Sequence, residues 1–195
     1  MVTTAGLVLA AGAGRRMGGP KALVRLVDGG PTLVETAVER LLAAGCDRAV
    51  VVVGAAAGRS AAAVGATGAE VVTASDWAEG MGASLRAGLA HLGTGTDDIA
   101  LVTLVDLPDV TAAVMARVLA PALAAGRAAL VRAAYAGLPG HPVAFGRDHW
   151  ADVAAGAHGD RGAREYLHAT PHLLVECADL ATGRDVDTVQ DLNRA

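Results

Sequence analysis

An apolar run that leads into a glycine-rich, basic loop constrains this chain more than any other feature. Residues Leu7 to Leu9 are apolar, and the loop from Gly12 to Lys21 holds four glycines, two arginines and a lysine. The run is typical of a strand buried on both faces. Glycines let consecutive backbone N–H groups point into one concavity, where they can bind an anion. A phosphate-binding loop and an ordinary glycine-rich turn both fit, because the spacing is neither the dinucleotide-binding nor the P-loop pattern.

The single lysine of the chain favours the phosphate interpretation. Sixteen residues are lysine or arginine, and every one of them except Lys21 is an arginine. A compact ammonium group acts as a point charge that suits a polyphosphate. Chance placement is the weaker explanation, so we expect this loop to bind phosphate.

The composition favours one globular domain, which we expect to span residues 1–195. Hydrophobic residues make up 53% of the chain, which is enough for a core. Only 3% of residues are aromatic and the net charge is −4, so we expect no nucleic-acid partner. The chain shows no membrane-spanning run and no signal-peptide pattern, so we expect a cytoplasmic protein. Cys46 and Cys177 form neither a disulfide framework nor a zinc motif, and we expect buried thiols.

Strand and helix patterns alternate along the chain. Compact apolar or β-branched runs predict further strands at residues 48–53, 69–73, 99–105, 128–134 and 172–177. Helical spacing predicts helices at residues 31–44, 55–67, 111–125 and 147–154, one beginning near residue 83 and one running to residue 168. Such alternation is typical of βαβ units, so we expect a mostly parallel sheet covered by helices on both faces.

Asp106 follows directly after the apolar run at residues 99–105. A carboxylate at the carboxyl end of a buried parallel strand lies in the crevice where open α/β sheets bind ligands. If the first loop binds a triphosphate, this carboxylate is suitably placed for Mg²⁺. Asp106 and Asp109 could instead cap the following helix. We assign the cap to Asp109 and the ligand role to Asp106.

Three further segments have both a structural and a functional interpretation. Ser84, with the glycines at positions 80 and 82, could seat a nucleoside at a helix start, or simply cap that helix. His141 lies in a proline- and glycine-rich segment, residues 137–145, which predicts a rigid turn, and it could contact a second substrate or be structural. Asp160 is expected to cap the helix that ends at residue 168. Asp187 or Thr188 is expected to cap a tail helix.

Several of these segments together resemble one family. The stretch Leu9-Ala10-Ala11-Gly12-x-Gly14-x-Arg16-Met17-Gly18-x-x-Lys21 is similar to the signature loop of the nucleotidyltransferases that activate sugars, isoprenoid precursors and the molybdenum cofactor. Residues 80–85, 105–108, 140–143, 159–163 and 185–188 most closely resemble the molybdenum cofactor cytidylyltransferase branch of the MobA-like nucleotidyltransferase family. The resemblance covers nearly the whole chain. It implies a Rossmann-like three-layer α/β/α sandwich of the nucleotide-diphospho-sugar transferase type.

The resemblance also implies the roles of individual residues. Arg16 and Lys21 would neutralise the triphosphate, and Asp106 would bind Mg²⁺, with Asp187 or Asp160 as a candidate second carboxylate. His141 is the candidate acceptor contact because of its place in the segment at residues 137–145, not because of the resemblance. The residues implied to bind the nucleotide are Leu9, Ala10, Ala11, Gly12, Gly14, Gly80, Met81, Gly82 and Ser84.

The implied reaction moves a nucleoside monophosphate from an NTP, with CTP favoured, to a phosphorylated acceptor, and releases pyrophosphate. The acceptor would be the molybdenum cofactor, and a molybdoenzyme or its maturation factor would be a protein partner. A phosphate monoester is already a competent nucleophile, so positioning and charge neutralisation suffice without a catalytic triad. Two alternatives remain. One is a guanylyltransferase acting on the molybdenum cofactor or another phosphorylated small molecule, and the other is a non-catalytic nucleotide-binding module.

Overall fold

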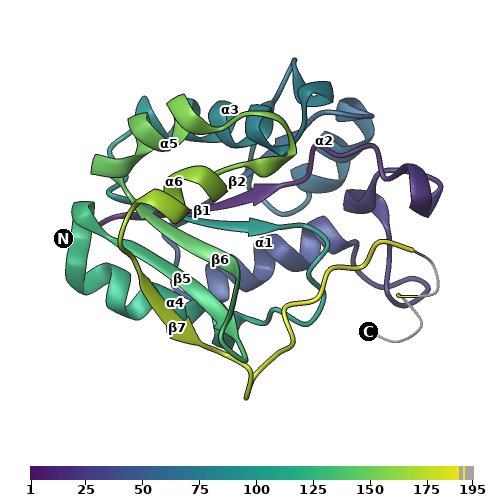
Figure 1. Cartoon of the computed structure of the whole chain (residues 1–195). Helices are drawn as coiled ribbons and strands as arrows, with labels where there is room; N and C mark the ends of the chain where they lie inside the picture. Colours follow the sequence, from purple (N-terminus) through teal and green to yellow (C-terminus); the bar gives the residue numbers. More distant parts are fainter. Residues whose placement is uncertain (189–190, 192–195) are drawn as a thin grey trace.

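A seven-stranded sheet forms the centre of the protein in this computed structural model, which describes residues 1–188 and 191 (Figure 1). The strands are β1 (Thr4–Leu9), β2 (Arg48–Val53), β3 (Glu70–Thr73), β4 (Ile99–Leu104), β5 (Leu130–Tyr135), β6 (Leu138–Gly146) and β7 (Leu173–Glu176). Their order in the sheet is β3-β2-β1-β4-β6-β5-β7. β6 runs antiparallel to β4 and β5, and the other neighbouring strands are parallel. The predicted mostly parallel sheet is therefore confirmed.

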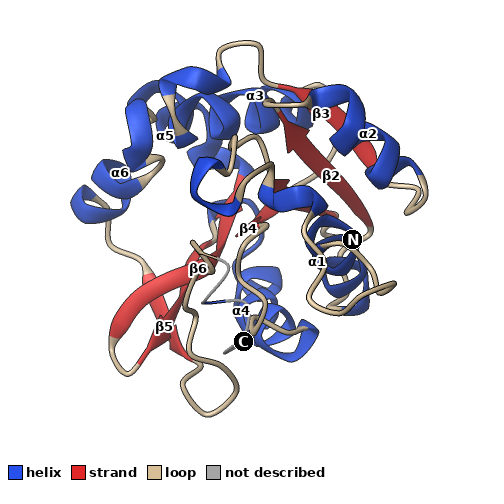
Figure 2. Cartoon of the chain, turned by 90° about the vertical axis from the view of Figure 1, so that its right-hand side faces the viewer, coloured by secondary structure: helices blue, strands red, loops and turns tan. Residues whose placement is uncertain are grey.

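Helices cover both faces of this sheet (Figures 1 and 2). One face packs against α1 (Leu33–Ala43), α2 (Ala57–Gly65) and α4 (Ala112–Ala125), and the other against α3 (Met81–Gly93), α5 (Trp150–Gly156) and α6 (Arg164–Ala169). Alternate residues of β1 serve the two hydrophobic cores, with Val8 in the first and Leu7 and Leu9 in the second. This alternation explains why the run is apolar without interruption. The predicted three-layer α/β/α sandwich is confirmed.

The segment at residues 137–145 is a strand, so the prediction of a rigid turn there was wrong. The turn consists of Ala136 and Gly137, and β6 follows at once. Arg132 of β5 pairs with Val143, but Ala134 pairs with Pro139, so residues 140–142 of β6 form a bulge. A bulge tolerates proline because the ladder of backbone hydrogen bonds is already interrupted there.

Two predicted helix caps were also wrong. The α4 helix begins after Thr111 without a side-chain cap, and the Oδ2 atom of Asp109 instead accepts hydrogen bonds at 2.6 Å from the backbone N–H and the hydroxyl of Thr182. Asp160 lies in the short helix η6 (Gly159–Arg161), and α6 begins after Ala163, also without a side-chain cap. Asp109 bonds to a distant residue and Asp160 lines a cleft. Helical spacing in the sequence does not predict either contact. The predicted tail helix falls largely on residues outside those described.

Two predictions drawn from composition can be compared with the structure. Cys46 and Cys177 are both buried and unpaired, as expected. In the part of the chain that the structure describes, no helix has the length and apolar character required to cross a bilayer.

Candidate functional site

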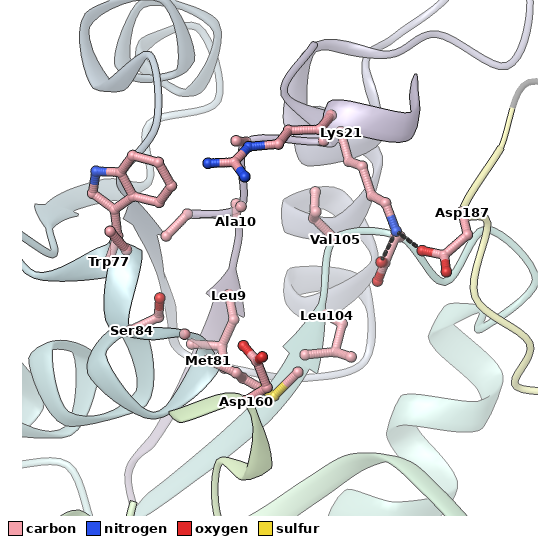
Figure 3. A pocket seen from close by; sticks show the side chains of 18 of the residues that line it. Leu9, Ala10, Lys21, Trp77, Met81, Ser84, Leu104, Val105, Asp160 and Asp187 are labelled. Carbon is pink, nitrogen blue, oxygen red and sulfur yellow. Dashed lines mark hydrogen bonds and ion pairs between the residues drawn. The ribbon is translucent and has the colours of Figure 1, made fainter. Parts of the chain in front are cut away.

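A cleft of about 520 Å³ opens at the carboxyl ends of β1 and β4 (Figure 3). Its walls come from the loop after β1, the segment leading into α3, the end of β4 and the chain after β7. Twelve residues predicted from the sequence line it: Leu9, Ala10, Ala11, Gly12, Gly14, Arg16, Lys21, Gly80, Met81, Ser84, Asp106 and Asp187. The fold thus brings together segments that lie far apart in the sequence.

The loop after β1 is held in shape by its own backbone. The carbonyl of Gly14 accepts hydrogen bonds from the N–H groups of Met17 at 2.9 Å and Gly19 at 3.2 Å. Gly14 has a φ of 57°, and a Cβ atom there would collide with the carbonyl oxygen of Gly19. Only glycine fits this position without distortion. The turns η1 (Arg15–Met17) and η2 (Lys21–Leu23) follow from it and place three basic side chains along the cleft.

Four charged side chains meet at one end of the cleft, and we call Arg16, Lys21, Asp106 and Asp187 the charged clamp. The Lys21 Nζ atom lies 2.6 Å from Asp106 Oδ2 and 2.5 Å from Asp187 Oδ1 (Figure 3). The Arg16 Nη1 atom lies 2.9 Å from Asp187 Oδ2. The clamp joins the loop after β1, the end of β4 and the chain after β7.

The clamp shifts the pKa values of its own members. Burial lowers the pKa of Lys21, but the hydrogen bonds and charges of Asp106 and Asp187 outweigh burial, and the net pKa is raised. The hydrogen bond from Lys21 lowers the pKa of Asp187. Both groups are therefore charged at neutral pH.

Three carboxylates at the clamp form a set suited to a divalent cation. Asp106, Asp185 and Asp187 each offer an oxygen atom, and these three atoms lie within 4.8 Å of one another. Oxygen-only ligands are the preferred donors of hard cations such as Mg²⁺ and Mn²⁺. The donor set therefore fits the metal that the sequence resemblance implied. Sequence reasoning proposed Asp106 and Asp187 but missed Asp185, although it stands two positions before Asp187.

The opposite end of the cleft is apolar and aromatic. Trp77, in the short helix η3 (Trp77–Glu79), lines the cleft together with Met81 and Ser84 (Figure 3). Ser84 is buried and does not cap α3, whose N-cap is Gly80. Sequence reasoning missed Trp77, although it lies three residues before the glycine segment that was singled out. The other lining residues that were not predicted to bind the nucleotide are Ala13, Arg15, Ala78, Leu104, Val105 and Asp160.

Two predicted site residues do not line the cleft. Gly82 lies in the first turn of α3 and faces the backbone of Ala157, so it allows close packing there. His141 lies in the bulge of β6, where its carbonyl accepts a 2.7 Å hydrogen bond from the hydroxyl of Tyr135. Burial and the charge of Arg132 lower the pKa of His141 to about 4. The imidazole is therefore neutral at physiological pH.

Sequence comparison relates this chain to one family and to one curated relative. Residues 6–174 match the MobA-like NTP transferase domain. The nicotine blue oxidoreductase of Paenarthrobacter nicotinovorans is 40% identical over 201 residues, which cover 97% of this chain and 94% of the relative.

Solved structures agree with the sequence match. Rv0371c from Mycobacterium tuberculosis H37Rv has a TM-score of 0.81 and 31% identity, over 99% of this chain and 96% of its own. That protein has also been solved in complex with manganese. A nucleotidyl transferase from Methanothermobacter has a TM-score of 0.80 and 26% identity, over 98% of this chain and 95% of its own. The neighbours have the nucleotide-diphospho-sugar transferase fold, so the predicted fold class is confirmed.

Proposed function

Because this chain belongs to the MobA-like NTP transferase family, we propose that it transfers a nucleoside monophosphate from an NTP to a phosphorylated acceptor and releases pyrophosphate. CTP is the favoured nucleotide and the molybdenum cofactor the first candidate acceptor. The observation that carries the proposal is the charged clamp next to the loop after β1, where the chain's single lysine meets Asp106 and Asp187. This arrangement suits a bound triphosphate and its metal better than it suits a neutral ligand.

The loop after β1 and the clamp would divide the work of binding the nucleotide. Gly12 has no neighbouring atom where a Cβ would stand, so phosphate can approach the backbone closely there. Lys21 and Arg16 would exchange part of their contact with Asp187 for contact with phosphate oxygens. The apolar end of the cleft, with Met81 and Ser84, would hold the nucleoside.

Asp106, Asp185 and Asp187 would hold Mg²⁺ in this proposal. The bound cation would neutralise charge on the triphosphate and on the leaving pyrophosphate. Support comes from the oxygen-only donor set and from the manganese complex of the mycobacterial relative.

The reaction requires little from the protein beyond positioning and neutralisation. An oxygen of the acceptor's phosphate attacks the α-phosphorus of the NTP and forms the new P–O bond. The bond between the α-phosphorus and the oxygen that bridges to the β-phosphorus breaks, and pyrophosphate leaves with that electron pair. Lys21 and Arg16 would stabilise the charge that develops on the departing group.

The test is pyrophosphate release, measured with each of the four ribonucleoside triphosphates, Mg²⁺ and a molybdopterin-type acceptor. We expect CTP to give the highest kcat/KM. Lys21→Ala should lower kcat/KM. The decrease should correspond to a loss of about 2–4 kcal/mol of transition-state stabilisation, the usual loss for one oriented electrostatic group. Arg59→Gln is the matched control, because Arg59 is exposed on α2 outside the cleft.

Each of the remaining possible results would point to a different function or acceptor. A preference for GTP would indicate a guanylyltransferase, and turnover with only another phosphorylated compound would reject the molybdenum cofactor as acceptor. Nucleotide binding without any turnover would indicate a non-catalytic module. Full activity in Lys21→Ala would reject the clamp as the phosphate site.

A second candidate function follows from the name of the curated relative. The chain is 40% identical to a protein named nicotine blue oxidoreductase, so a redox reaction on the same scaffold is the main competing proposal. It is tested with the same preparation by following oxidation of NADH or NADPH at 340 nm in the presence of nicotine blue. Dye-dependent oxidation together with the absence of pyrophosphate release would favour this candidate over nucleotidyl transfer.

A further inference from the structure

A half-buried arginine in the middle of β5 lacks a carboxylate partner. The Nε atom of Arg132 donates to the carbonyl of Gly140 at 3.1 Å, and Nη2 contacts the carbonyl of Pro139 at 3.5 Å. It forms no ion pair with any carboxylate of the residues that the structure describes. Burial lowers the pKa of Arg132. A charge that is partly removed from water is stabilised by an opposite charge nearby, so a bound anion would stabilise this half-buried guanidinium.

The surroundings of Arg132 add positive charge rather than negative. Arg164, exposed at the start of α6, lowers the pKa of Arg132 further through its charge, and it too forms no ion pair within the described chain. His141 is the other titratable neighbour, and it is neutral near pH 7. The positive charges of Arg132 and Arg164 therefore repel each other, and no acidic side chain of the described residues forms an ion pair with either guanidinium.

The bulge in β6 explains how Arg132 is held. Residues 140–142 leave the regular ladder, so the carbonyls of Pro139 and Gly140 turn toward the guanidinium. The Tyr135 hydroxyl fixes the same bulge through its 2.7 Å hydrogen bond to the carbonyl of His141. Bulges commonly re-aim groups beside functional sites. The two carbonyls orient the guanidinium group of Arg132 and leave its other N–H donors free to bind a ligand.

Arg132 is not among the residues that line the cleft, but β5 and β6 lie beyond β4, on the side of the cleft away from β1. β6 lies beside β4 (Figure 2). Val143 pairs with Val102 and the two strands are antiparallel, so residues 140–142 lie toward the carboxyl end of β4. Leu104 and Asp106, just beyond that point, line the cleft. On the helical side, Asp160 lines the cleft and Arg164 follows four residues later.

We propose that Arg132, assisted by Arg164, binds a second oxyanion of the acceptor, separate from the phosphate that reacts at the charged clamp. The inference rests on the proposed function, because it places the acceptor between Asp106 and the bulge of β6. A guanidinium fork binds carboxylate and phosphate oxygens in pairs, and neutral His141 adds polarity without a competing charge. The acceptor would therefore carry a carboxylate or phosphate in addition to the reacting phosphate. A molybdopterin-type acceptor has only the reacting phosphate, so within the proposed nucleotidyl transfer this subsite favours another phosphorylated compound as acceptor.

The test follows the imidazole NMR signals of His141 while inorganic phosphate, or in a second series acetate, is added to the full-length protein. His141→Asn assigns the signals. We expect a saturable shift in the wild type, with the tighter anion indicating which group the subsite accepts. Arg132→Gln should weaken the apparent affinity by about tenfold or more, the usual effect of losing a charge-assisted pair. Arg59→Gln should leave it unchanged.

Two additional variants keep the result interpretable. Arg132→Lys retains the charge but not the fork, and should weaken binding by several-fold while the thermal unfolding midpoint stays near that of the wild type. It provides the test if Arg132→Gln does not fold. Lys21→Ala should leave the His141 shift intact, so loss of nucleotidyl transfer and loss of this subsite are separate results. Equal affinity in the wild type and the Arg132 variants, or no saturable shift in the wild type, would overturn the inference.

Discussion

The ammonium group of Lys21 contacts two carboxylates at once at the end of the cleft where the charged clamp lies. Arg16 and Lys21 carry two positive charges, whereas Asp106, Asp185 and Asp187 carry three negative charges, so the group has a net charge of −1. Adding one divalent cation changes the sum to +1. On these charges, the cleft should attract a triphosphate only after the metal has bound.

Asp185→Asn should therefore weaken both metal and nucleotide binding. The substitution removes one of three carboxylates that lie within reach of a single cation. We expect Mn²⁺ affinity, measured by isothermal titration, to fall by about tenfold, the low end of the range known for disturbed metal sites. EDTA should abolish NTP binding in the wild type. Asp152→Asn, on the exposed side of α5, is the control. An unchanged Mn²⁺ affinity in Asp185→Asn would exclude Asp185 as a ligand.

The ion pair between Lys21 and Asp187 should stabilise the metal-free protein over a wide pH range. The raised pKa of Lys21 makes its contribution complete below its ordinary value of 10.5 and lost as pH rises through the folded-state pKa. The lowered pKa of Asp187 makes its contribution complete above its ordinary value of 3.8 and lost as pH falls through the folded-state pKa. The difference in unfolding free energy between wild type and Lys21→Met, from urea titrations, should be constant between about pH 5 and 9. A steep change within that range would contradict the assignment.

At the scale of single elements, the hairpin between β5 and β6 contains a residue in an unfavourable conformation. Ala136 has a φ of 52° and Gly137 a φ of 78°, the pattern of a two-residue turn with both central residues left-handed. The carboxylate of Glu176 accepts hydrogen bonds at 2.9 Å from both of their N–H groups. Glu176 of β7 therefore fixes the turn that leads into β6.

Ala136→Asn should stabilise the protein, because asparagine tolerates the left-handed region better than alanine. The expected gain is about 0.5–1 kcal/mol in unfolding free energy, part of the cost of a left-handed L-residue. Urea denaturation measures it, and the backbone N–H donated to Glu176 is retained. Ala151→Asn in α5 is the control and should be neutral or slightly destabilising. A loss of stability in Ala136→Asn would show that the turn is held differently.

At the scale of the whole molecule, one segment connects the far edge of the sheet to the cleft. The chain from residue 178 to residue 188 runs from β7 to the loop after β1 (Figure 1). It is attached by Thr182 to Asp109, by the N–H of Val186 to the carbonyl of Asp106 at 2.9 Å, and by Asp187 to the charged clamp. This segment delivers Asp185 and Asp187, so the metal ligands depend on its path.

Gly183→Ala should disturb that path without unfolding the protein. Gly183 has a φ of 66°, and a Cβ atom there would collide with the ring of Tyr135. We expect Mn²⁺ affinity to fall while the thermal unfolding midpoint changes by only a few degrees, since Ala181 is the only described residue of the segment that packs against either hydrophobic core. Gly156→Ala, which has open space around it, is the control. Unchanged Mn²⁺ affinity would show that the segment adapts locally.

The sequence by itself determined the features that depend on local pattern. The uninterrupted apolar run of β1, the alternation of strands and helices, and the position of Asp106 at a strand end follow from side-chain periodicity, which the chain carries within short windows. The glycine loop and Lys21 were recognisable for the same reason, because their geometry is set by neighbouring residues. These features were enough to predict a mostly parallel sheet covered by helices on both faces, while most of the residues predicted to line the cleft came from the resemblance to the family.

Only the tertiary structure decided which distant groups meet. Asp187 joins Lys21 across 166 positions of sequence, and Asp185 joins the carboxylate set with it. The prolines of β6 indicated a turn, but the strand pairing places Pro142 in a bulge near Arg132 and Pro139 opposite Ala134. Such contacts depend on strand order and on the paths of connecting segments, which are set by packing the whole chain into one core. Local pattern carries no information about those distances, because the free energy that fixes them appears only when the layers assemble.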